Sequence, residues 1–245
     1  SFSKTSELDT SGYNKWQGFK AGQVVHVVAT FDGTTESIYT NGALCVSKNV
    51  SPNAAGLTYV PDTTSPIMIG DGSVLPTTAG QQPFSGVLDE VAIYTNLLQL
   101  SDVQAHYAAA SSGYAAAVQA SNPLLYYRFD DGVSASGSVY DRASYPVAAN
   151  SGSLGALANG LTQPGTAPGV QGPAYAGFGA NSKAVAFNGF FGTVNIGNNS
   201  TLPLELNPSN YTTMSVVAWF KTSPADSPGR NQEILGHSDS SYRLT

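Results

Sequence analysis

Charged side chains are scarce in this sequence of 245 residues: Asp, Glu, Lys and Arg make up 11% of it, and the formal net charge is −6. Nucleic-acid binding depends on clustered positive charge, so a chain with 10 basic and 16 acidic residues is not expected to bind nucleic acid. The sequence also lacks a run of 18 apolar residues, so we expect no insertion into a membrane. The surface must therefore consist mainly of uncharged polar residues.

Cysteine and recognisable catalytic motifs are also lacking. The lone Cys45 cannot form an internal disulfide or a two-cysteine metal knuckle, and we expect it to be a small buried core residue. There is no Gly-x-Ser-x-Gly elbow, and His26, His106 and His237 follow no zinc or triad spacing. Within its apolar segment, His26 is expected to be packed and hydrogen-bonded across a sheet. The apolar surroundings of Trp219 predict a core position.

The sequence is rich in short apolar segments that contain β-branched and aromatic residues and are separated by turn residues. This pattern predicts an antiparallel all-β domain. Strands at residues 24–31 and 37–40 end at Asp-Gly and Asn-Gly, which favour tight hairpin turns, so a three-strand meander is expected. Further strands are predicted at residues 66–70, 86–94, 124–129, 184–187, 193–196, 214–221 and 233–235. The continuously apolar runs 24–31 and 215–220 indicate strands that are covered on both faces.

One segment favours a helix. Ser101 and Gln104 have the spacing of a capping box, and the following Ala-rich residues predict a short helix over 102–110, with Val103 and Tyr107 as its apolar contacts. Residues 109–122 are small and polar and end at Asn-Pro, so we interpret them as a linker. The glycine-rich stretch 151–179 is interpreted either as a functional loop or as a set of edge strands.

Two ordered groups of motifs carry a family resemblance. The first group reads HVVATFDG at 26–33, IYTNG at 38–42, IMIG at 67–70 and FSGVLDEVAIY at 84–94, followed by the predicted helix. The second reads NPLLYYRFDD at 122–131, YD at 140–141, NSG at 150–152, AVAFNG at 184–189 and MSVVAWF at 214–220. Together they resemble laminin-G-like jelly-roll domains of the concanavalin A-like lectin and glucanase superfamily, of the type repeated in large bacterial surface proteins.

The resemblance implies an antiparallel two-sheet jelly-roll sandwich with one short helix, whose halves appear in permuted order. Residues 1–108 resemble the C-terminal half of such a domain and residues 123–245 the N-terminal half, with the linker 109–122 between them. The chain is expected to be cut in mid-domain. Three solutions remain open: the halves fold together as one permuted domain, neighbouring copies complete one another head to tail, or the chain is part of a longer tandem array.

The superfamily includes glucanases, whose retaining members need two carboxylates about 5 Å apart. The nearest acidic pair is Asp89 and Glu90. Adjacent residues on a strand point to opposite faces, so we predict that this pair cannot catalyse hydrolysis and that the protein is not an enzyme.

The resemblance also implies binding sites. Related domains hold calcium with carboxylate and amide oxygens, and the candidate ligands here are Asp131, Asp141, Asp130, Asn150 and Asp89. Glycan binding would use aromatic side chains in turn-rich sequence, for which the candidates are Trp16, Tyr13, Tyr175 and Phe178.

We therefore predict a non-catalytic structural or adhesive module, located outside the cell or on a bacterial cell surface. Its expected partners are neighbouring copies of the same domain, through strand or half-domain complementation in a tandem repeat or a head-to-tail filament. A carbohydrate-binding module is the first alternative, and a polysaccharide hydrolase is the second.

Overall fold

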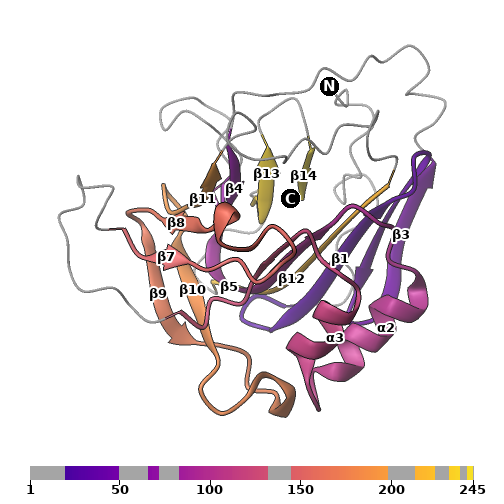
Figure 1. The fold of residues 1–245 in the computed structure, drawn as a ribbon, viewed down its shortest axis with the longest axis horizontal. Coiled ribbons are helices and arrows are strands. Elements are labelled where there is room, and N and C mark those ends of the chain that lie inside the picture. The colour runs from indigo at the N-terminus through magenta and orange to yellow at the C-terminus, as the bar shows by residue number, and fades with distance from the viewer. Residues whose placement is uncertain are drawn as a thin grey trace.

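The protein is described by a computed structural model that defines residues 20–49, 66–71, 83–131, 145–197, 213–223, 232–237 and 242–244. These residues form two antiparallel sheets with helices on one side (Figure 1). The architecture is mostly β and agrees with the predicted concanavalin A-like sandwich.

The larger sheet has eight strands in the order β3-β2-β1-β12-β5-β10-β9, and β6 also pairs with β5. Its strands are β1 (Val25–Phe31), β2 (Thr35–Thr40), β3 (Ala43–Asn49), β5 (Ser85–Tyr94), β6 (Leu125–Tyr127), β9 (Thr166–Gln171), β10 (Lys183–Asn188) and β12 (Met214–Thr222). The predicted meander is confirmed as β1, β2 and β3. Asn41 and Gly42 both have positive φ, at 51° and 80°, as a two-residue hairpin turn requires.

The smaller sheet has six strands in the order β14-β13-β4-β11-β8-β7. They are β4 (Ile67–Ile69), β7 (Val147–Ala148), β8 (Gly160–Thr162), β11 (Val194–Gly197), β13 (Leu235–His237) and β14 (Tyr242–Leu244). The glycine-rich stretch thus contains β8 and β9, and β9 is an edge strand of the larger sheet.

Both sheets contain strands from both halves of the sequence. Strand β12 lies between β1 and β5, pairing Val28 with Val217 on one side and Val217 with Ala92 on the other. In the smaller sheet, β4 lies between β11 and β13. Within this single chain, the two halves fold together into both sheets.

Two hydrophobic layers enclose the larger sheet. The inner core lies between the sheets and joins, for example, Val27 and Val216 to Ile69 and Val194. The outer cluster lies on the other face of the larger sheet, where α2 (Leu100–Ala109), α3 (Tyr114–Ala120) and the short helix η3 (Ala176–Phe178) cover it. Figure 1 shows α2 and α3 on the side of β1 and β12 away from β13 and β14. The continuous apolar runs are therefore covered on both faces, as predicted.

The predicted linker contains helix α3. Its Tyr114 and Val118 are fully buried in the outer cluster, four residues apart on one helix face. The predicted helix is confirmed as α2, with Val103 buried. A capping box is present there, but it is formed by Gln99 and Asp102 rather than by Ser101 and Gln104.

The prediction that Cys45 is buried is wrong. Cys45 is exposed on β3, the edge strand of the larger sheet, at a register shift against β2. A single apolar residue carries no signal of whether its strand is central or at an edge, so burial could not be inferred from its type.

Candidate functional site

The candidate site lies on the helix-covered face of the larger sheet, at a bulge in β5. The register between β12 and β5 shifts at this point, and Glu90 has a positive φ of 53°. Asp89 lies directly opposite Trp219, a member of the outer cluster, while Glu90 contacts Tyr126 of the same cluster. The expectation that these carboxylates point to opposite faces is therefore wrong, because a bulge interrupts the alternation of a strand and redirects a side chain.

Glu90 is 1% exposed and interacts with a residue of β6 and with a residue that follows β6. The Tyr126 hydroxyl donates to Glu90 Oε2, and Arg128 Nε lies 3.6 Å from Glu90 Oε1. Burial raises the pKa of Glu90 to about 7, while the bond from Tyr126 and the charge of Arg128 act in the other direction. The carboxyl group therefore prefers the protonated form over much of the acidic range.

Asp89 is also 1% exposed and is less well satisfied. Its Oδ1 accepts a hydrogen bond of 2.9 Å from the Glu90 amide, whereas Oδ2 has no hydrogen-bond partner among the described residues. Burial and the neighbouring Glu90 charge raise the pKa of Asp89 well above its ordinary value. A carboxyl group in this setting is favoured in its neutral form.

A third acidic side chain, Asp130, completes the charged cluster. Arg128 Nη2 lies 2.6 Å from Asp130 Oδ2, and Asp130 Oδ1 accepts a 2.9 Å bond from the Lys183 amide. Arg128 thus joins Glu90 to Asp130 at the margin of the sheet. Breaking such a pair costs more than its formation gains, because the remaining charge stays partly buried.

Aromatic rings form the neighbouring part of the outer cluster, around Trp219. The fully buried Trp219 has its ring centroid 5.0 Å from His26, 6.1 Å from Tyr107, 5.3 Å from Tyr175 and 5.2 Å from Phe178. The prediction that Trp219 is a core residue is confirmed. His26 is packed as expected, but neither ring nitrogen has a hydrogen-bond partner among the described residues, and burial lowers its pKa to about 3.

The charged cluster and the aromatic rings around Trp219 both join residues from the two halves of the chain. Asp89, Glu90, His26 and Tyr107 come from the first half, and their contacts Tyr126, Arg128, Tyr175 and Trp219 come from the second. What this arrangement does chemically is to bind one half to the other. Neither carboxylate of the acidic pair is accessible to a polysaccharide chain, which a glycosidase requires.

The structure gives most of the described calcium candidates protein partners. Asn150 Oδ1 accepts from the amides of Tyr126 and Gly152, and Asp131 Oδ2 accepts from the Ala149 amide at 2.7 Å. Both oxygens of Asp130 are engaged as given above. Asp141 lies outside the described residues.

A calcium site requires six to eight oxygen ligands, and Asn150 Oδ1, Asp131 Oδ2 and both oxygens of Asp130 already accept hydrogen bonds or pair with Arg128. Within the described ranges, no three His, Cys, Asp or Glu side chains are placed to share a metal ion. Asp89 and Asp130 do interact electrostatically, but as part of the Arg128 cluster.

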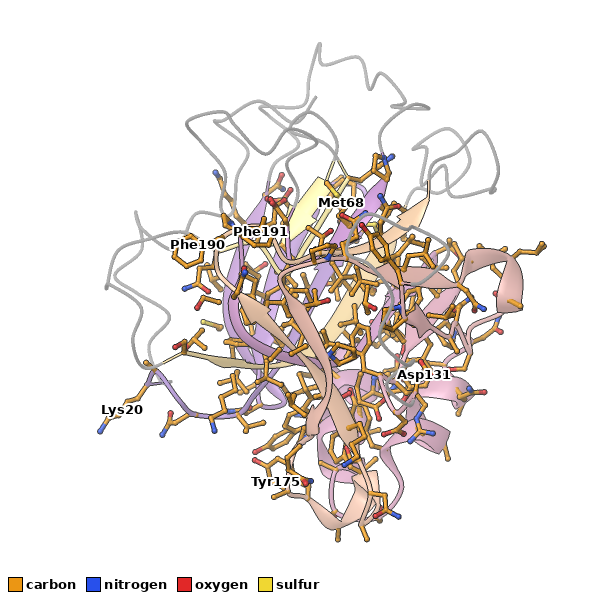
Figure 2. The ribbon with its side chains drawn as sticks, turned by 90° about the vertical axis from the view of Figure 1, so that its left-hand side faces the viewer. Lys20, Met68, Asp131, Tyr175, Phe190 and Phe191 are labelled. Carbon is orange, nitrogen blue, oxygen red and sulfur yellow. The ribbon has the colours of Figure 1, made fainter. Side chains whose placement is uncertain are left out.

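Of the aromatic candidates, Tyr13 and Trp16 lie outside the described residues. Tyr175 and Phe178 lie together, with ring centroids 6.1 Å apart; Tyr175 is 40% exposed and Phe178 is buried. Figure 2 shows Tyr175 at the bottom of the molecule, apart from the exposed Phe190 and Phe191 at the upper left and from Asp131 at the right.

Sequence reasoning missed three residues that complete the site. Tyr126 and Arg128 are two positions apart on and after β6, so their shared face could have been inferred. The 37% exposed Tyr107 was expected only as a helix contact, and its stacking on Trp219 depends on where α2 lies, which the sequence does not specify.

None of the helices within the described ranges has the length and hydrophobicity of a membrane span. The comparison with curated proteins gave no match, and neither did the comparison with solved structures. Residues 2–104 match the family Laminin_G_3, described as the concanavalin A-like lectin/glucanases superfamily. This match confirms the resemblance for residues 2–104, which are similar to laminin-G-like domains of the concanavalin A-like superfamily.

Proposed function

We propose that this protein is a non-catalytic module that acts outside the cell in a structural and adhesive role, in association with neighbouring copies of itself. The observation that carries the proposal is the burial of Asp89 and Glu90 at 1% exposure, at the contact between the two halves. Within this pair, which comes closest to the hydrolytic motif, Glu90 contacts Tyr126 and Arg128 of the other half, and Asp89 lies opposite Trp219 of the other half. The chemistry of the pair is that of a structural contact.

The test of the non-catalytic part is the release of reducing ends from a panel of polysaccharides. We expect no release above background. Release that persists through purification and disappears in Glu90→Gln would overturn this part of the proposal, because Gln keeps the shape of the side chain but cannot act as an acid.

The test of the structural and adhesive part is attachment between surfaces. Beads coated with the protein should cluster with one another, and free protein added in excess should prevent the clustering by occupying the same contacts. Beads that stay dispersed at every coating density would contradict an adhesive role between copies.

A second candidate function, carbohydrate binding, is favoured by the two partly exposed tyrosines that flank Trp219. Tyr107 stacks near the buried indole and Tyr175 lies tilted against it at 50°, and they leave 37% and 40% of their surfaces exposed. Rings held in this way can stack on the apolar face of a sugar.

Its test is saturable binding on a glycan array, with Tyr175→Ala as the variant and Phe190→Ala as the matched control. Phe190 is 71% exposed and lies away from Tyr175 (Figure 2). Binding that weakens at least tenfold in Tyr175→Ala alone would support this function; equal binding by all three proteins would exclude the Tyr175 surface.

Calcium remains a proposal that depends on Asp131 and Asp141. A rise in melting temperature on adding calcium, lost in Asp131→Asn, would support it. An unchanged melting temperature with calcium and with a chelator would count against it.

A further inference from the structure

The two halves of the sandwich are connected by one short turn. Helix α2 ends at Ala109 and α3 begins at Tyr114, so residues 110–113 form the connection. The amides of Ser112 and Gly113 donate to Ala109 O at 3.0 and 2.9 Å, and a methyl group added to Gly113 would meet nothing within 4 Å. Ala110 is buried in the outer cluster and its carbonyl accepts a 2.8 Å hydrogen bond from the Gly177 amide, so the part of the turn that can change without disturbing either sheet is residues 111–113.

The two halves interlock in both sheets. β12 of the second half inserts between β1 and β5 of the first, and β4 of the first half inserts between β11 and β13 of the second. Each half on its own would present several unpaired strand edges, which favour pairing with another chain. Each half consequently needs the other half of some copy.

Charged and aromatic contacts across the halves strengthen this requirement. Without its complement, the first half would lose the Tyr126 and Arg128 partners of Glu90, and the ring of His26 would lose Trp219. Exposing a strand edge beside an acidic cluster that has lost its partners costs free energy. Halves that lack a complement should therefore be rare.

We infer that the protein exchanges halves between copies when they are held together at high local concentration, with residues 111–113 as the hinge and a second copy of this chain as the partner. In the exchanged form the second half of one copy completes the first half of the next, and all the contacts described above are made between chains. Two copies that exchange with each other give a closed dimer, whereas successive exchange gives an open chain of sandwiches. This inference rests on the proposed structural function and supplies its mechanism.

The hinge decides between the closed and the exchanged form, because both contain the same sheets. A connection of a few residues keeps the two halves at an effective concentration of about millimolar, so the single-chain sandwich should dominate in dilute solution. Shortening the hinge removes the turn between α2 and α3, so the second half can no longer fold back onto the first half of the same chain. The equilibrium should therefore shift from the single-chain form to the exchanged form.

The experiment deletes residues 111–113, which joins α2 directly to α3, and measures mass by light scattering at micromolar protein concentration. We expect dimers and longer chains for the deletion and monomers for the unaltered protein. The matched control inserts Gly-Ser-Gly-Ser after Ser112, which lengthens the hinge and should leave a monomer.

A cysteine pair reports which copy supplies each strand. Val87 and Lys221 are opposite residues on β5 and β12, so Val87→Cys with Lys221→Cys in a Cys45→Ser background should form a disulfide across the two halves. The disulfide should lie within one chain in the control and between chains in the deletion, where oxidised dimers and ladders appear on a non-reducing gel. A deletion variant that is monomeric with disulfides only within the chain would overturn the inference.

If the deletion variant fails to fold, the cysteine pair is introduced into the protein with its hinge unaltered. This variant is refolded from urea over a hundredfold range of protein concentration. The fraction of disulfides between chains should rise with concentration; a constant fraction would overturn the inference. Failure of exchange leaves the non-catalytic function intact, because that function is tested by polysaccharide hydrolysis.

Discussion

Glu90 should make the folding stability depend on pH in an unusual direction. Its pKa is about 7 in the folded protein and 4.5 ordinarily, because the carboxylate form is buried. The folded state therefore holds the proton more tightly than the unfolded state. The stabilising contribution is present below pH 4.5 and is lost as the pH rises through 7, by about 3 kcal/mol at about 1.4 kcal/mol for each pH unit.

The perturbation is Glu90→Gln, whose side chain stays neutral at every pH. The assay is urea unfolding of both proteins at pH 4.5 and pH 8, analysed by linear extrapolation. The stability of Glu90→Gln minus that of the unaltered protein should increase by about 3 kcal/mol from the lower to the higher pH.

Tyr126→Phe provides a second comparison. Removing the hydroxyl that donates to Glu90 should raise its folded pKa further, so the loss of stability with rising pH should continue to higher pH and be larger in total than in the unaltered protein. If the difference in unfolding free energy between Glu90→Gln and the unaltered protein is the same at pH 4.5 and pH 8, Glu90 is not buried between the two halves and the reasoning is refuted.

Three further predictions concern the outer cluster and the turn beside it. Trp219→Ala should lower the free energy of unfolding by about 3 to 5 kcal/mol, whereas Phe190→Ala should change it by less than about 0.5 kcal/mol, both by urea titration. The pKa of His26 is lowered from 6.5 to about 3, so stability should fall as the pH drops through this interval, and His26→Phe should remove that part of the fall in acid unfolding curves. A methyl group on Gly177 would lie 2.3 Å from Ala109 O, so Gly177→Ala should lower the melting temperature by several degrees, while Gly113→Ala should not.

The strands were predictable because their signals are local. The apolar runs around β1 and β12 alternate between the inner core and the outer cluster, as Val27 and Val28 do, so both faces had to be covered. The Asn41 and Gly42 turn followed from the two residue types that tolerate positive φ. These features depend on a few neighbouring residues and need no knowledge of the rest of the chain.

Helix α3 had a local signal that was misinterpreted. Its Ala-rich sequence favours helix, and Tyr114 and Val118 have the spacing of a buried helix face. Small polar residues are also typical of a linker, and the adjoining Asn-Pro does end a helix. Periodicity should have outweighed the small average size of the side chains.

The candidate site was only partly predictable, because it forms between distant segments. Asp89 and Glu90 were identified as the nearest acidic pair, but the bulge that brings them to one face arises from the pairing of β5 with β12. The exposure of Cys45 depends likewise on β3 being at an edge. Neither property is encoded in the residues beside it.

The most direct test of the account is to cut the chain at the turn between the helices. A protease site inserted between Ser112 and Gly113 would release two fragments, and native light scattering of the cut protein would show whether they stay together. Since β12 lies between two strands of the first half and β4 between two strands of the second, we predict a one-to-one complex with the mass of a single chain that separates only in denaturant. Fragments that separate in native buffer and remain folded on their own would contradict the central claim that two interlocked halves form one sandwich.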